Sequence, residues 1–314
     1  MIEKYYSGVI EQIYNRIGKE TRNIVMANYS NDFSIENLEV IRRYQSNEDN
    51  VFFAYSEFSY NTLVGAYEPF LDIICNMHRR FIGGSFDDFQ KECGVYYLHR
   101  QVLNSYYETG ECFREETVLL NEVAYEQRRM TMAIADMLKR LSEVRPLMIV
   151  INRFQMASKS SIETIKYLID NPCANIGIVL GVNAIVKGAD STVEVWDRIV
   201  ESLEDRSAIY YIGSAGPLKN NIKTTNDDEL YITMNFEQSI QEASNIMEFL
   251  DYEQARRGCR IIEHKIKFEN AWIDEKSLRR FYLVYARTSV LLGEMSKAIE
   301  LMNEYKALIP ENDS

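Results

Sequence analysis

A run of five apolar residues near the middle of the chain constrains the fold more than any other segment. Leu147 to Ile151 is Leu-Met-Ile-Val-Ile; it follows Pro146 and ends at the polar pair Asn152-Arg153. An uninterrupted apolar run of this kind is typical of a strand that is buried on both faces, and such strands belong to parallel sheets. The sequence therefore predicts an α/β domain with this strand at its centre.

Four further apolar segments have the length and composition of buried strands. They are Asn23–Ala27, Val51–Tyr55, Ile176–Gly181 and Ala208–Ile212. Helical patterns separate them, and parallel neighbours need crossover helices that cover both faces of a sheet. We therefore predict a three-layer domain with a parallel five-stranded sheet over residues 1–234, closed by a short strand at Leu230–Thr233.

Beyond residue 235 the strand signals end and helical patterns take over. The last part of the chain resembles a tetratricopeptide repeat: Gly293 falls at the turn between two helices, Ala298 where the helices touch, and Pro310 after the second helix. A weaker copy places Ala255 43 residues before Ala298. The resemblance implies an all-α repeat region over residues 235–314. About three repeats are needed to bury the repeat faces, so this region packs on another part or partner, or begins a longer array.

The flanks of the central strand resemble those of the Mg²⁺-binding strand in P-loop ATPases of the AAA-related STAND group. An Arg-Pro pair precedes the strand at 145–146, and Phe154 to Ser158, with Ser160-Ser161, follows it. The first predicted strand also leads through a loop of about seven residues to a helix, which is the order of a P-loop. The resemblance implies a P-loop NTPase-like domain followed by tetratricopeptide-like helices.

The nucleotide-binding residues of that family are largely replaced in this chain. On this resemblance the GxxxxGK[ST] motif would place its first glycine at Ala27, its Gly-Lys pair at Asp32-Phe33 and its hydroxyl at Ser34, and only Ser34 matches. No lysine or glycine occurs between residues 23 and 40 in any register. The degenerate pocket comprises eight residues: Ala27, Asn31, Asp32, Phe33, Ser34, Asn152, Arg153 and Asn183.

These replacements predict the loss of catalysis. The resemblance places Asn152 where the Mg²⁺-binding carboxylate belongs and Arg153 where the carboxylate that activates water belongs, and an arginine cannot act as a base. Losing two charged contacts costs roughly 3 to 6 kcal/mol, or about 10² to 10⁴ in affinity. We therefore expect no catalytic residue and no cofactor. In the alternative, Asn28, Asn31 and Asp32 keep the loop's shape, and Arg153 neutralises a phosphate without Mg²⁺.

Composition excludes other classes of function. The net charge of −12, from 35 basic and 47 acidic residues, argues against a nucleic-acid face and against binding to an anionic membrane. The five cysteines include no CxxC pair, so neither a disulfide framework nor a zinc site is predicted. The isolated His78, His99 and His264 are expected on the surface rather than as metal ligands. No leader or membrane span is recognisable, which favours the cytoplasm.

The resemblance implies a function in signalling. STAND proteins act as switches in which a helical-repeat sensor controls an output domain. We expect a pseudo-ATPase scaffold from a cytoplasmic signal-transduction or transcription-type regulator, which binds a protein partner or effector through residues 235–314. The output domain would lie beyond the chain or be replaced by self-association. The rival hypothesis is a nucleotide-binding switch or weak ATPase with a divergent, Mg²⁺-independent site.

Overall fold

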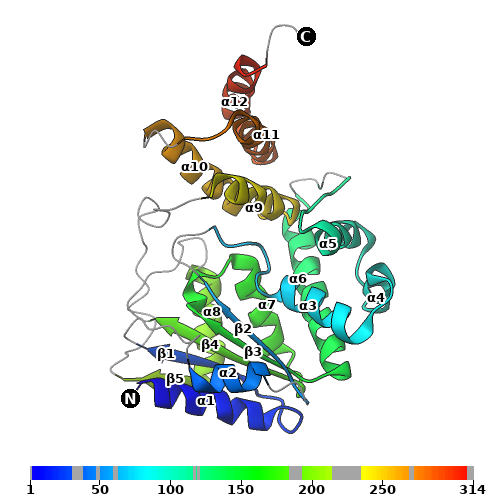
Figure 1. Ribbon diagram of the computed structural model, residues 1–314, viewed down its shortest axis with the longest axis vertical. Coiled ribbons are helices and arrows are strands. Elements are labelled where there is room, and N and C mark those ends of the chain that lie inside the picture. Colours follow the sequence, from blue (N-terminus) through cyan, green and yellow to red (C-terminus); the bar gives the residue numbers. More distant parts are fainter. Residues whose placement is uncertain are drawn as a thin grey trace. The chain divides into compact units, whose positions relative to one another are not determined.

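The computed structural model describes residues 2–29, 38–46, 50–58, 63–115, 118, 121–183, 193–213, 235–268 and 272–309, without the side chains of 193–195. The chain forms two compact units that are interleaved in sequence. The sheet unit comprises Met1–Tyr60, Tyr67–Val95 and Met130–Thr225. The helical unit comprises Asn61–Ala66, Tyr96–Arg129 and Asn226–Ser314. Figure 1 labels the helices and strands of both units.

The sheet unit contains a five-stranded, all-parallel sheet in the order β2-β3-β4-β1-β5. The strands are β1 (Ile24–Tyr29), β2 (Phe52–Glu57), β3 (Leu147–Asn152), β4 (Ile176–Asn183) and β5 (Ile209–Ile212). The predicted α/β class and the parallel five-stranded sheet are therefore confirmed. β1 runs two residues beyond the predicted end at Ala27, because β4 continues beside it and Tyr29 pairs with Asn183. The strand predicted at Leu230–Thr233 lies outside the described residues.

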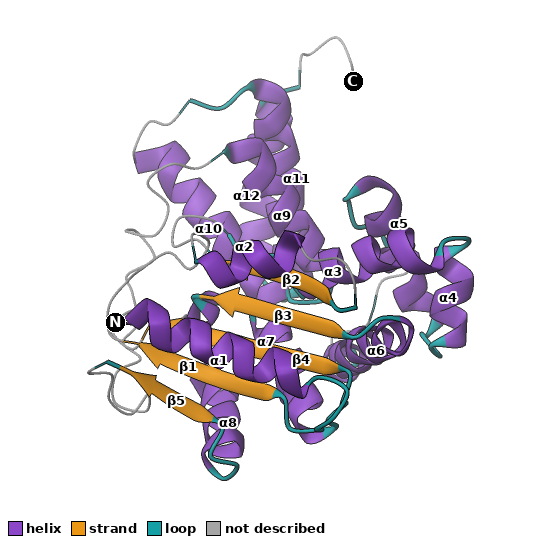
Figure 2. Ribbon diagram, turned by 60° about the horizontal axis from the view of Figure 1, so that its bottom comes forward, coloured by secondary structure: helices purple, strands orange, loops and turns teal. Residues whose placement is uncertain are grey.

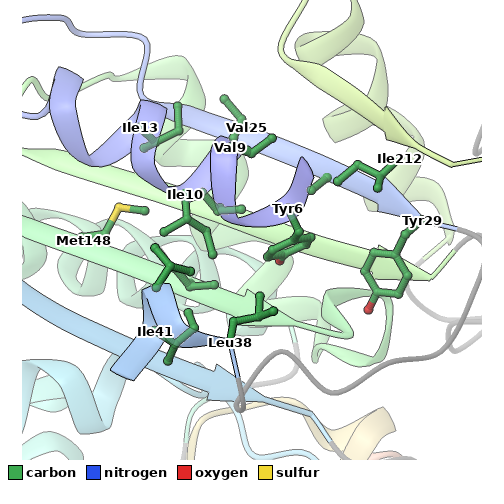
Figure 3. Packing of buried hydrophobic residues seen from close by; sticks show 14 residues of the cluster. Tyr6, Val9, Ile10, Ile13, Val25, Tyr29, Leu38, Ile41, Met148 and Ile212 are labelled. Atoms are coloured by element: carbon green, nitrogen blue, oxygen red, sulfur yellow. The ribbon is translucent and has the colours of Figure 1, made fainter. Parts of the chain in front are cut away.

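Helices cover both faces of this sheet (Figure 2). α1 (Ile2–Arg16) and α2 (Glu39–Ser46) lie on one face, and α7 (Lys159–Asp170) and α8 (Val193–Glu204) lie on the other. Side chains alternate between the faces of a strand. The residues beneath α1 and α2 accordingly alternate, and they form the core shown in Figure 3: Tyr6, Val9, Ile10, Ile13, Val25, Ala27, Tyr29, Leu38, Val40, Ile41, Met148, Val150, Val179 and Ile212.

The remaining helices of the sheet unit follow β2. They are α3 (Phe70–Met77), a π-helical turn (His78–Ile82), α4 (Phe86–Glu92) and the part of α6 (Val123–Val144) from Met130 onward. The prediction of a surface histidine at position 78 is wrong. The His78 ring is fully buried and packs 5.0 Å from the Phe86 ring and 5.2 Å from the Phe89 ring, between centroids. An imidazole has enough apolar surface to pack among aromatic rings.

The helical unit contains α5 (Tyr97–Thr109), α9 (Phe236–Glu248), α10 (Tyr252–Phe268), α11 (Glu275–Leu291) and α12 (Met295–Ala307), which confirms a helical C-terminal region. Its turns α9–α10 and α11–α12 have the same backbone geometry. Leu250 (φ 69°) and Gly293 (φ 77°) are both left-handed. Their amides donate to the carbonyls three residues back, at 2.9 and 3.0 Å.

The spacing of these two turns fits the sequence repeat. The amides of Asp251 and Glu294 donate to the carbonyls five residues back, at 3.1 and 2.8 Å. Ala255 and Ala298, each five residues after its left-handed residue, are 0% and 5% exposed. The two helical hairpins are therefore equivalent at an offset of 43 residues, the offset of the paired alanines in the sequence. Pro310 lies outside the described residues.

A buried polar cluster lies within the helical unit, where the sequence predicts a surface histidine at position 99. The His99 ring is fully buried, with Nε2 3.0 Å from Oε2 of Glu126. Burial and the nearby positive charges of Arg114 and Arg129 lower the pKa of His99 to about 3, so its imidazole is neutral at pH 7. The surface prediction is therefore wrong here as well, while His264 is exposed as expected.

No helix in the described ranges combines the length and apolar character needed to cross a membrane.

The left-handed backbone of Gly293 and the helical position of Gly8 predict opposite effects for two glycine-to-alanine substitutions. A Cβ at Gly293 meets no atom within 4 Å, so the left-handed φ of 77° is the cost, and Gly293→Ala should destabilise the protein by about 1 kcal/mol. Gly8 lies in the exposed part of α1 with nothing within 4 Å, and Gly8→Ala should stabilise it by about 0.5 to 1 kcal/mol. Urea unfolding of both variants measures the difference. Equal effects would contradict the assigned turn.

Candidate functional site at the carboxyl edge of the sheet

Three buried asparagines lie near the ends of neighbouring strands at the carboxyl edge of the sheet, where ligands bind in open α/β sheets. Asn152 and Asn183 are the last residues of β3 and β4, and Asn28 is the penultimate residue of β1; they are 0%, 2% and 0% exposed. Alternation places Asn152 and Asn183 on the face covered by α1, and Asn28 on the opposite face. We call these three strand ends the amide edge. The strand order therefore brings together two of the residues predicted for the degenerate pocket.

Two tyrosines fill the space above the amide edge. The Tyr29 hydroxyl donates a hydrogen bond to Oδ1 of Asn152. The Tyr6 ring from α1 stands edge-on to the Tyr29 ring, with centroids 6.2 Å apart and planes at 73° (Figure 3). Burial, and then the neighbouring Tyr29, Tyr55 and Glu57, raise the pKa of Tyr6 well above its ordinary value, so the Tyr6 phenol remains neutral at pH 7.

Gly181 of β4 makes room for Tyr6. A Cβ at position 181 would overlap the Tyr6 hydroxyl oxygen and would lie 2.9 Å from Oδ1 of Asn152. Close packing of Tyr6 against the strand therefore requires a residue without a side chain at this position. The tyrosine ring occupies the face of β4 next to Asn152, on which a ligand approaching the strand end would otherwise lie.

The charged residues at the described strand ends pair with each other. Arg153 has a left-handed backbone (φ 54°, ψ 39°), and its Nη1 lies 3.0 Å from Oε1 of Glu57 and 3.5 Å from the carbonyl oxygen of Phe58. Glu57 ends β2 in register with Asn152 and also accepts a hydrogen bond from the Tyr55 hydroxyl. The guanidinium is thus neutralised inside the chain. An ion pair of this kind opposes the binding of phosphate by Arg153.

The segment behind β3 is held by its own polar side chains. The side-chain oxygen of Gln155, in a 3₁₀ turn (Phe154–Met156), accepts a hydrogen bond from the backbone amide of Asn183 at 3.2 Å. Ser160 accepts from the amide of Tyr67 at 3.0 Å, and the Ser161 hydroxyl donates to the carbonyl of Glu68 at 2.7 Å. These serines therefore fix the segment that follows β2. Their observed partners belong to the chain itself.

The structure describes only one of the five residues predicted for the P-loop part of the degenerate pocket. Ala27, which is predicted as the last residue of the first strand, lies inside β1, fully buried and paired with Gly181 and Tyr210. Asn31, Asp32, Phe33 and Ser34 lie outside the described residues. Among the residues that are described, no group of three His, Cys, Asp or Glu side chains could hold a metal ion. The described part of the edge offers neutral amides, phenols and one internal ion pair.

Sequence reasoning missed Tyr6, Tyr29, Glu57 and Gly181. The signal for Glu57 was its place two residues after an apolar strand, at the same edge as Asn152. Gly177 and Gly181 are four residues apart, which puts them on one face of β4 and signals close approach of another element. Nothing in the sequence pairs Tyr6 with that face, because the contact depends on where α1 crosses the sheet.

Two comparisons with known proteins add no relative. No protein-family model matches the chain, and no curated protein matches its sequence.

The contact between Tyr6 and Gly181 predicts a coupled pair of substitutions. Gly181→Ala should destabilise the protein by about 2 kcal/mol through overpacking. In a Tyr6→Phe background the same change should cost less, because the overlapping hydroxyl oxygen is gone and Cζ would be 3.3 Å from the new Cβ. Gly177→Ala, which meets flexible Ile17 Cδ1 at 2.8 Å, is the matched control. Additive free energies for the Tyr6 and Gly181 changes would refute the contact.

A carboxylate at position 152 should destabilise the folded protein as the pH rises. Asn152 is fully buried, so burial should raise the pKa of the aspartate in Asn152→Asp above its unfolded value. A raised pKa in the folded state gives stability that is present at low pH and is lost as pH rises. The variant should therefore lose about 2 kcal/mol or more, relative to the parent, between about pH 5 and pH 8. Thermal unfolding at both pH values tests this, with Asn175→Asp as the control.

Proposed function

We propose that this chain is a non-catalytic pseudo-ATPase scaffold of the STAND type, acting through protein–protein interaction in a cytoplasmic signal-transduction or transcription-type regulator. The observation that carries the proposal is the amide edge. Its Asn152 accepts a hydrogen bond from the Tyr29 hydroxyl, and the neighbouring Arg153 pairs with Glu57. At the described strand ends the carboxylate of Glu57 and the cation of Arg153 are engaged with each other, and β3 ends in an amide, whereas ATP hydrolysis is catalysed with a carboxylate that holds Mg²⁺ and a cation that binds phosphate.

The topology of the sheet supports a P-loop origin. In the order β2-β3-β4-β1-β5 the first strand lies between β4 and β5, which differs from the 3-2-1-4-5-6 order of dinucleotide-binding folds and the 2-1-3-4-5 order of flavodoxin-like folds. The ends of β3, β4 and β1 therefore lie next to one another at the carboxyl edge of the sheet. A P-loop after β1 would face the ends of β3 and β4, as the proposed ancestry requires.

The outer face of the last hairpin supports a role in protein binding. On α11 and α12 the side chains of Leu283, Val290, Met295 and Ile299 are 43%, 48%, 56% and 61% exposed. In the equivalent first hairpin, at an offset of 43 residues, Met247 stands at the position of Val290 and contacts Thr288 of α11. The corresponding face of the second hairpin is thus suited to a further helix, from a protein partner or from more repeats.

The alternative, a nucleotide-binding switch with a Mg²⁺-independent site, needs a cation at this edge to hold phosphate. Arg153 is the basic residue at the described strand ends, and its ion pair with Glu57 would have to break first. That requirement disfavours the alternative.

Calorimetric titration with ATP and with ADP, each with and without Mg²⁺, distinguishes the two proposals. The scaffold should give no saturable binding at micromolar nucleotide, since a dissociation constant of about 1 mM or weaker is expected. The switch should bind at micromolar nucleotide. Arg153→Gln is the matched variant: micromolar binding that this substitution abolishes would overturn the scaffold proposal and assign the phosphate contact to Arg153.

A further inference from the structure

A pocket of about 210 Å³ lies at the opposite, amino edge of the sheet, within the sheet unit. It is formed where β1 and β5 begin, at the tail ends of their arrows in Figure 2, and where α1, α7 and α8 end. We call it the arginine pocket, because its lining includes Arg16, Arg22 and Arg206. Neither the resemblance nor the amide edge assigns it a role.

The charge of the arginine pocket opposes that of the chain. Three arginines and one carboxylate, that of Glu20, line it, although the chain as a whole has a net charge of −12. Nε of Arg16 lies 3.6 Å from Oε2 of Glu20, so this pair leaves two arginines of the lining without a lining carboxylate. A positive pocket on an acidic protein concentrates small anions locally.

The two remaining arginines differ in how they are held. Nη1 of Arg206 donates to the carbonyl oxygen of Ile169 at 2.5 Å, which fixes the guanidinium at the end of α7. Arg22, in the connection between α1 and β1, forms no ion pair with a described residue. A guanidinium offers a planar fork of donors that matches carboxylate and phosphate oxygens. The lining therefore includes one arginine that is anchored to the chain and one that forms no ion pair with a described residue.

Part of the lining of the arginine pocket is apolar. Ile24, Ala208 and Tyr210 belong to this lining and are half-buried, so they keep accessible apolar surface. The volume of about 210 Å³ is somewhat larger than the roughly 150 Å³ of an engineered apolar cavity that binds benzene, so it suits a compact ligand. A compact molecule with one anionic head and a short hydrocarbon tail matches both the size and the two kinds of wall.

We propose that the arginine pocket binds a small organic anion, with its carboxylate or phosphate on Arg22 and Arg206 and its short apolar tail against Ile24, Ala208 and Tyr210. The guanidinium groups supply the charge, and the half-buried apolar side chains favour a short hydrocarbon tail over a polar one. The site is independent of the amide edge, since it lies at the other ends of the same strands.

Calorimetric titration of the full chain with propyl phosphate, butyrate and inorganic phosphate tests the site, with 1-butanol as the uncharged analogue. At least one of the tailed anions should bind saturably, more tightly than inorganic phosphate, and 1-butanol should not bind. The order of propyl phosphate and butyrate identifies the head group. Arg22→Gln should weaken binding about tenfold to hundredfold, as expected for one charged hydrogen bond.

Lys19→Gln is the matched control, because it removes the same charge from the neighbouring turn while Lys19 is absent from the pocket lining. It should change affinity by less than about threefold at physiological ionic strength. Amide chemical-shift changes at Thr21, Arg22 and Ser207 locate the ligand. No saturable binding up to about 10 mM of any anion, equal losses in both variants, or shifts confined elsewhere would each overturn the proposal.

Discussion

The close approach of α1 to β4 is the interaction on which the sheet unit depends. Gly177 and Gly181 lie on the same face of β4, and a Cβ on either would collide with the N-terminal segment, at Ile17 directly after α1 and at Tyr6 of α1. A helix normally packs on the side chains of a sheet. Here it packs on backbone, and the aliphatic residues of α1 reach the core beneath it. The amphipathic pattern of residues 2–16 and the two glycines therefore act together: the glycines let α1 approach β4 closely, and the apolar side chains of α1 fill the core.

This packing also determines what the carboxyl edge can do. Tyr6 is carried to the end of β4 by the same helix, where its ring meets Tyr29, and Tyr29 in turn satisfies Asn152. A buried amide and a phenol form a neutral hydrogen bond with little desolvation cost, whereas a carboxylate in the same place would be stabilised only by a cation. The tyrosines thus make the buried amide of Asn152 compatible with a closed core.

The two edges of the sheet differ in electrostatic character. At the carboxyl edge the charges of Glu57 and Arg153 cancel within 3.0 Å. At the amino edge three arginines face a single carboxylate around a pocket of about 210 Å³. Parallel strands place their beginnings and ends on opposite sides, so a chain can neutralise one edge and charge the other without changing its core. The proposed anion site therefore lies at the edge opposite to the one at which the resemblance implies a nucleotide pocket.

The sequence by itself determined the elements of this fold. Continuous apolar runs such as Leu147–Ile151 specified buried parallel strands, and the 43-residue spacing of Ala255 and Ala298 specified two equivalent hairpins, since both signals depend on local periodicity. It also located Asn152 and Asn183 at strand ends. It failed for His78 and His99, because burial of an isolated polar residue depends on which distant rings and charges surround it.

Only the tertiary structure decided which strand ends are neighbours, that Tyr6 covers Gly181, that Glu57 neutralises Arg153, and that Arg22 and Arg206 share a pocket. Residues 22 and 206 are far apart in the chain, and no local pattern encodes their proximity. Strand order and the crossing of α1 set those distances, because they arise from packing whole elements together rather than from the composition of any one of them.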